Sequence, residues 1–127
     1  MEHTADLRIR AWGRSFQGTL LDLSNYVMDM IYGRDILPDV FLSSSLEYES
    51  NDSCVVRLLN DLIYESERRG LAIRVKKITI CEGSIRWEAT GEKADRRKRG
   101  SILVKAATYD RIKVSRVPPM VEVTLDI

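Results

Sequence analysis

The chain has 127 residues, of which 44% are hydrophobic and 31% are charged, a composition typical of one globular domain rather than of a disordered segment. Lysine and arginine (20) nearly balance aspartate and glutamate (19), so the overall charge indicates neither a nucleic-acid-binding protein nor a membrane-surface protein. No apolar run approaches the roughly 20 residues that cross a bilayer, and no basic-then-apolar leader opens the chain, so we expect the protein in the cytoplasm. The length of the chain predicts a single domain over residues 1–127.

The N-terminal part of the chain predicts a strand followed by a long helix. Apolar and basic residues alternate over residues 7–11, which is typical of a half-buried strand. Ser15 is the expected N-cap of the helix, and Gly33 is expected to close it. Apolar residues recur between them at spacings typical of one helix face: Phe16, Leu20, Leu23, Val27, Met30 and Ile31. This stripe predicts an amphipathic helix that packs one face against the core.

A second strand and a second helix are expected next. Residues 46–50 alternate between apolar and polar side chains and predict a strand. We expect Asn51 or Asp52 to cap the second helix and Gly70 to end it. The apolar stripe of this helix consists of Val55, Leu58, Leu59, Leu62 and Ile63. Its spacing also predicts an amphipathic helix.

The rest of the chain has the two-residue period of strands. The adjacent Lys76 and Lys77 shift the parity of one strand and indicate a β-bulge, and Glu82-Gly83-Ser84 predicts a hairpin turn. The same period returns over residues 102–106, 112–117 and, after Pro118-Pro119, 121–127. The sequence therefore predicts an α+β fold, a single domain in which two amphipathic helices pack against mixed or antiparallel β-sheet.

Two aspartates lie next to strands at opposite ends of the chain. Asp6 precedes the first strand, and Asp126 is near the end of the last one. If the apolar residues of the last strand face the core, Asp126 faces the opposite side and is accessible. With the terminal carboxyl of Ile127, the two aspartates are candidates for a site that binds a hard divalent cation, because clusters of oxygen atoms hold such ions. The simpler interpretation is a turn-capping Asp6 and a solvated Asp126, and spacing alone does not show that the two ends meet.

Other candidate residues carry weaker indications. His3 is the only histidine, and we interpret it as a hydrogen-bonded structural group, because zinc needs nitrogen or sulfur ligands that this chain cannot gather. Cys54 and Cys81 are interpreted as small buried hydrophobic residues rather than as a disulfide. The basic segment from Lys93 to Arg99 is either a solvated loop or a surface for RNA phosphates or an acidic partner.

These segments together resemble the archease family. The specific parts of the resemblance are the opening Glu2-His3-Thr4-Ala5-Asp6 and the segment Val104-Lys105-Ala106-Ala107-Thr108-Tyr109. The long helix that ends near Tyr32, the paired leucines before Gly70-Leu71 and the terminal Asp126-Ile127 extend the resemblance over essentially the whole chain.

The chain departs from the family pattern at two places. A histidine is expected after Thr108-Tyr109, where this chain has Asp110, and another is expected before Gly100, where Arg97, Lys98 and Arg99 stand. Roles that depend on those histidines are therefore not carried over to this protein.

The resemblance implies an archease-like fold and a non-catalytic protein cofactor of the RtcB-type RNA ligase, which joins exons in tRNA splicing. Such a cofactor promotes guanylylation of the ligase and its multiple turnover, and it meets tRNA only through the ligase. The resemblance also implies a calcium-type metal site formed by Asp6, Asp126 and Ile127, where magnesium or another divalent cation is an alternative. Thr4 and His3 are expected to shape the turn that presents Asp6. The metal site formed by these three residues is expected to dock at the ligase active site and to help position the nucleotide.

Three other interpretations stay open. A metal-dependent hydrolase or nuclease could use the same carboxylates, although the sequence offers no convincing general base. An RNA-binding module could act through the basic segment, although that segment has no interleaved aromatic residues for base stacking. A chaperone-like scaffold could hold a purely structural ion at the same site.

Overall fold

The computed structural model describes residues 5–94 and 102–127. The elements of these residues are β1 (Asp6–Trp12), α1 (Phe16–Tyr32), β2 (Val40–Glu47), α2 (Asn51–Arg69), β3 (Leu71–Cys81), β4 (Ser84–Lys93), β5 (Ala106–Arg116) and β6 (Pro119–Asp126). The predicted α+β class is confirmed, and so is the strand-helix-strand-helix order of the first four elements.

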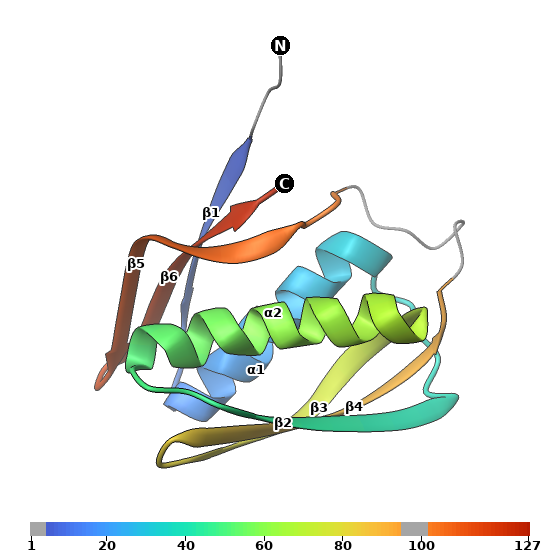
Figure 1. Ribbon diagram of the computed structural model, residues 1–127, viewed down its shortest axis with the longest axis horizontal. Helices are drawn as coiled ribbons and strands as arrows, with labels where there is room; N and C mark the ends of the chain where they lie inside the picture. Colours follow the sequence, from blue (N-terminus) through green and yellow to red (C-terminus); the bar gives the residue numbers. More distant parts are fainter. Residues whose placement is uncertain (1–4, 95–101) are drawn as a thin grey trace.

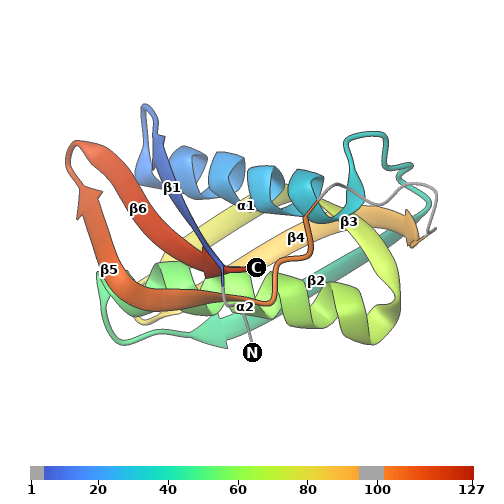
Figure 2. The same ribbon diagram turned by 90° about the horizontal axis from the view of Figure 1, so that it is seen from above.

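The strands form two antiparallel three-stranded sheets. One sheet has the order β1-β6-β5, and the other has the order β2-β4-β3. The two helices lie between them, so that one sheet covers each side of the helical layer (Figures 1 and 2). Because β1 pairs with β6, the first and last strands of the chain are neighbours.

The core lies where the helices meet the inner faces of both sheets. The apolar stripes of α1 and α2 are buried as predicted, except that Met30 and Ile31 at the end of α1 are only half-buried. Trp87 of β4 is fully buried, and its indole Nε1 donates a hydrogen bond to Asp61 Oδ2 at 2.8 Å. This bond provides the partner that a buried indole N–H requires.

The helix caps agree with the sequence in one case and differ in the other. Ser15 caps α1, and its hydroxyl accepts a backbone N–H of the first turn at 3.0 Å. α2 is capped by Ser50, so the prediction of Asn51 or Asp52 is wrong by one or two residues. Ser50 Oγ accepts the Ser53 N–H at 3.1 Å, and Ser53 Oγ accepts the Ser50 N–H at 2.9 Å. The reciprocal pair satisfies two donors, which a single side-chain cap cannot do.

The extents of two predicted strands differ from the structure. β2 begins well before residue 46 and ends at Glu47, because residues 48–50 already turn toward the cap of α2. The strands expected over 102–106 and 112–117 are one bent strand, β5, which begins only at Ala106.

Each helix binds the edge of one sheet through an asparagine. Asn25 of α1 donates to the Val75 carbonyl at 3.0 Å and accepts the Val75 N–H at 2.8 Å. Asn60 of α2 bonds both backbone groups of Ala107 in the same way, at 3.1 and 2.7 Å. The Asn25 contact lies beside the predicted bulge, which is confirmed by a register shift between Val75 and Lys77. These amides satisfy part of the outer edges of β3 and β5.

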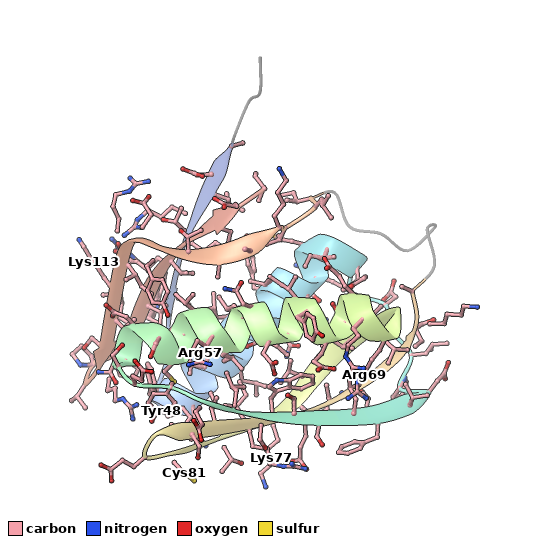
Figure 3. The ribbon with its side chains drawn as sticks, in the orientation of Figure 1. Tyr48, Arg57, Arg69, Lys77, Cys81 and Lys113 are labelled. Carbon is pink, nitrogen blue, oxygen red and sulfur yellow. The ribbon has the colours of Figure 1, made fainter. Side chains whose placement is uncertain are left out.

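The remaining residue predictions have mixed outcomes. Both cysteines are free, and Cys54 is buried as predicted, whereas Cys81 is exposed because it ends β3 at the hairpin, on the β2-β4-β3 side of the molecule (Figure 3). His3, Thr4 and residues 95–99 of the basic segment lie outside the described residues. Neither helix in the described part of the chain is long and apolar enough to span a membrane.

Candidate functional site

The register of β1 against β6 places Asp6 directly opposite Asp126. Both side chains are exposed at the end of the ladder. Ile127 follows, and its N–H donates to the Ala5 carbonyl at 3.1 Å. The fold thus brings together the three predicted residues from opposite ends of the chain. Figure 2 shows the beginning of β1 beside the end of β6. We refer to Asp6, Asp126 and Ile127 as the acidic corner.

The hydrogen-bond pattern of the ladder sets the spacing between the backbones of Asp6 and Asp126. The bond from Ile127 to Ala5 marks a hydrogen-bonded position, so the adjacent Asp6–Asp126 position is a non-hydrogen-bonded pair. Cα atoms in such pairs are about 4.5 Å apart, and their side chains are closer than in the alternate pairs. Like charges placed opposite one another repel, and a divalent cation bound between them would remove that repulsion.

A cluster of two arginines and one glutamate continues the same face of the sheet. Arg8 Nη2 donates to Glu122 Oε2 at 2.7 Å, and Arg10 Nε donates to Glu122 Oε1 at 2.7 Å. The hydrogen bonds from Arg8 and then from Arg10 hold the pKa of Glu122 below its ordinary value of 4.5, although burial acts in the opposite direction. The two guanidinium groups cover Glu122, which is only 6% exposed.

Sequence reasoning missed this cluster, although the signal for it was present. The alternation over residues 7–11 puts Arg8 and Arg10 on the same face of β1 as Asp6. Glu122 and Asp126 share the corresponding face of β6. The missing information was the register that sets Arg10 opposite Glu122.

The next strand, β5, bends beside this cluster. Four residues of β5 (109–112) face a single residue of β6, which is a large bulge. Arg8 Nη2 donates to the Arg111 carbonyl at 2.6 Å, and Thr124 Oγ1 donates to the Asp110 carbonyl at 2.9 Å. These bonds fix the bulge to β1 and β6. Asp110, which stands where the family resemblance predicts histidine, is exposed on the bulge and accepts a hydrogen bond from Arg111 Nε at 3.1 Å.

The donor set of the acidic corner fits a hard cation. Asp6 and Asp126 offer carboxylate oxygens, and Ile127 offers main-chain oxygen, the ligand types that calcium and magnesium take. In residues 5–94 and 102–127, no group of three or more histidine, cysteine, aspartate or glutamate side chains is arranged to hold a metal. An ion at the corner would therefore complete its shell with main-chain oxygens and water, which calcium accepts readily because its geometry is flexible.

Sequence comparisons with known proteins cover nearly the whole chain. Residues 1–127 match the model of the archease protein family (MTH1598/TM1083). A protein archease of Pyrococcus furiosus is 31% identical over 123 residues, which cover 92% of this chain and 87% of that protein.

Two solved structures share the fold. The solution structure of Methanobacterium thermoautotrophicum protein 1598 has a TM-score of 0.78 at 17% identity and covers 100% of this chain and 96% of its own. The crystal structure of a Thermotoga maritima archease, described as a possible chaperone, has a TM-score of 0.65 at 22% identity, with 98% and 91% covered. The family match over residues 1–127 and the Pyrococcus relative show that the chain belongs to the archease family.

Proposed function

We propose that this protein is a non-catalytic cofactor of an RtcB-type RNA ligase in tRNA splicing, which promotes guanylylation and multiple turnover of the ligase. The observation that carries the proposal is the pairing of Asp6 with Asp126 at the exposed end of the β1–β6 ladder. Membership of the archease family supports a cofactor-like or chaperone-like role. The cytoplasm is the proposed location, and tRNA is met only through the ligase.

We also propose that the acidic corner binds calcium, with magnesium or another divalent cation as an alternative. Asp6 and Asp126 would each contribute carboxylate oxygen, and Ile127 would contribute main-chain oxygen. When bound, the ion would supply positive charge that can be shared with the oxygens of a nucleotide phosphate.

The role of the chain itself is to hold the acidic corner rigid and to present it to the ligase. The β1–β6 ladder sets the separation of Asp6 and Asp126, and the bonds from Arg8 to Glu122 and to the Arg111 carbonyl tie three strands together behind it. Nucleotidyl transfer depends mainly on positioning and on preorganised charge. A rigid acidic corner docked at the ligase active site would contribute to both.

A guanylylation time course with limiting ligase tests this function. Wild-type protein should accelerate guanylylation in the presence of calcium, and Asp126→Ala should not. Asp110→Ala is the matched control, because it removes an exposed aspartate of the same sheet whose carboxylate is bonded by Arg111. Equal acceleration by wild type and Asp126→Ala would remove the acidic corner from the mechanism. Metal-dependent hydrolysis of RNA by the protein alone would instead support a hydrolase.

The same geometry supports a chaperone-like scaffold as a second candidate. Because Asp6 and Asp126 lie on the first and last strands, an ion between them would fasten the two ends of the fold together. In that case calcium would raise the melting temperature of wild type, and Asp126→Ala would abolish this gain. The variant would nevertheless still activate the ligase at a temperature where it is folded.

A further inference from the structure

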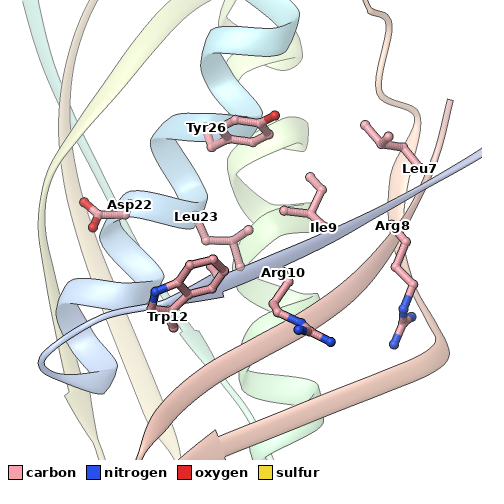
Figure 4. A pocket seen from close by; sticks show the side chains of 9 residues that line it. Leu7, Arg8, Ile9, Arg10, Trp12, Asp22, Leu23 and Tyr26 are labelled. Carbon is pink, nitrogen blue, oxygen red and sulfur yellow. The ribbon is translucent and has the colours of Figure 1, made fainter.

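A groove of about 420 Å³ runs along the outer edge of β1, between this strand and α1 (Figure 4). Its apolar lining includes Leu7 and Ile9 from the strand and Leu23 from the helix. Trp12 and Tyr26 stand at its rim and are 70% and 54% exposed. Large aromatic side chains with this exposure are common in surfaces that bind partners.

The backbone beside the groove has hydrogen-bonding groups that pair with nothing in the described part of the chain. Among the strands of residues 5–94 and 102–127, β1 pairs only with β6, and the alternation of the ladder turns the N–H and C=O groups of Arg8 and Arg10 outward, away from β6. No hydrogen bond from the described residues reaches these outward groups. The outer edges of β3 and β5 differ, because Asn25 and Asn60 bind them. A row of unpaired backbone groups along an apolar groove is the arrangement that accepts an additional strand.

The charges beside the groove define the chemistry of that strand. Figure 4 shows Ile9 on the side of β1 that faces α1, and Arg8 and Arg10 on the opposite side. The two arginines share the single carboxylate of Glu122, and the Arg10 side chain is 64% exposed. Around Arg10 this face therefore keeps excess positive charge, to which the nearby Lys113 adds, whereas Asp6 and Asp126 make its other end acidic. An added strand fits best if its apolar residues face α1 and its acidic residues face Arg10.

We propose that the free edge of β1 is the docking site of an extended segment of the ligase, with alternating apolar and acidic side chains. The inference rests on the proposed function, because it assigns the surface by which the same partner is held. The groove ends at Leu7, next to Asp6, so a segment bound there would hold the ligase beside the acidic corner.

Two variants at one position separate the backbone contribution from the side-chain contribution. Arg10→Pro removes an outward N–H that is not used by the β1–β6 ladder, and Arg10→Ala removes the same side chain but keeps that N–H. Affinity for the ligase, measured by calorimetry, should fall about tenfold further in Arg10→Pro than in Arg10→Ala, because one backbone hydrogen bond is lost. Trp12→Ala and Tyr26→Ala, which change exposed side chains, should also weaken binding.

Amide hydrogen exchange of the full-length wild-type protein gives a test that needs no variant. The Arg8 and Arg10 amides should exchange fast in the free protein and at least tenfold more slowly, about 1.4 kcal/mol of protection, in the complex. The Ile9 amide points toward β6 and should be protected in both states.

Each remaining outcome overturns the inference and identifies what has failed. In one outcome wild type activates the ligase, but the Arg8 and Arg10 amides stay unprotected and Arg10→Pro binds like Arg10→Ala. The assignment of the β1 edge as the docking site is then wrong, while the proposed function stands. If wild type neither binds nor activates the ligase, the proposed function fails as well. Protection that appears with rising protein concentration and without ligase would identify a second copy of this chain as the occupant.

Discussion

The substitution Asp126→Asn should change the sign of its effect on stability when calcium is added. It removes one of two like charges in the acidic corner and keeps the size of the side chain. If the two carboxylates are as far apart as the Cβ atoms of directly opposite residues, about 5 Å, their repulsion in water is about 0.8 kcal/mol. Without calcium, the variant should therefore be more stable than wild type by about 0.5–1 kcal/mol, which raises the melting temperature of a domain of this size by about 2–4 °C.

Calcium should make wild type more stable than Asp126→Asn, because only the wild-type site has both carboxylates to bind the ion. Ligand binding adds about 2.7 kcal/mol of stability when the calcium concentration is about 100 times Kd, and the variant should gain much less. Thermal unfolding followed by circular dichroism, with chelator and then with calcium, measures both states. Asp110→Asn is the control and should show no calcium-dependent difference from wild type. A lower melting temperature of Asp126→Asn in chelator, or a calcium gain equal to that of wild type, would refute the reasoning.

Three further predictions concern the fold that supports the site. Asn60→Ala should destabilise the protein by about 2–4 kcal/mol in urea unfolding, because it leaves the backbone N–H and C=O of the buried Ala107 without their partners. An effect near zero would show that water replaces the amide of Asn60. Cys81 should react rapidly with a thiol reagent and Cys54 only after unfolding, because Cys54 is buried and burial raises its pKa; equally fast labelling of both would contradict the packing around α2. Glu122→Gln should lower the free energy of unfolding at neutral pH. The arginines lower the pKa of Glu122, and their stabilisation is lost when Glu122 is protonated. The free energies of unfolding of wild type and variant, measured in urea, should therefore converge as the pH falls below 4.5. A constant difference between the two down to the lowest pH would contradict that ion cluster.

Local signals in the sequence predicted the elements well, because caps and periodicity depend on near neighbours. The Ser15 cap, the end of α1 at Gly33 and the bulge at Lys76-Lys77 were all readable in this way. The α2 cap differs from the prediction because Ser50 and Ser53 each accept the other's backbone N–H, whereas Asn51 or Asp52 was expected to cap with a single side chain.

The division into two sheets and the site could not be derived from periodicity. A two-residue period shows which side chains share a face of one strand, but it does not show which strands pair. The opposition of Asp6 and Asp126, and the burial of Glu122 under Arg8 and Arg10, depend on a register between residues more than a hundred positions apart. The family resemblance, rather than spacing, led to the acidic corner.

Multiple-turnover ligation tests most directly whether the acidic corner activates the ligase. RNA in large excess over ligase should give more than one ligated product per ligase molecule when wild-type protein and calcium are present. Asp6→Asn and Asp126→Asn should each reduce the yield to one ligated product per ligase molecule, whereas Asp110→Asn should behave like wild type. Full multiple turnover with both acidic-corner variants, or its absence with wild type, would contradict the proposed function.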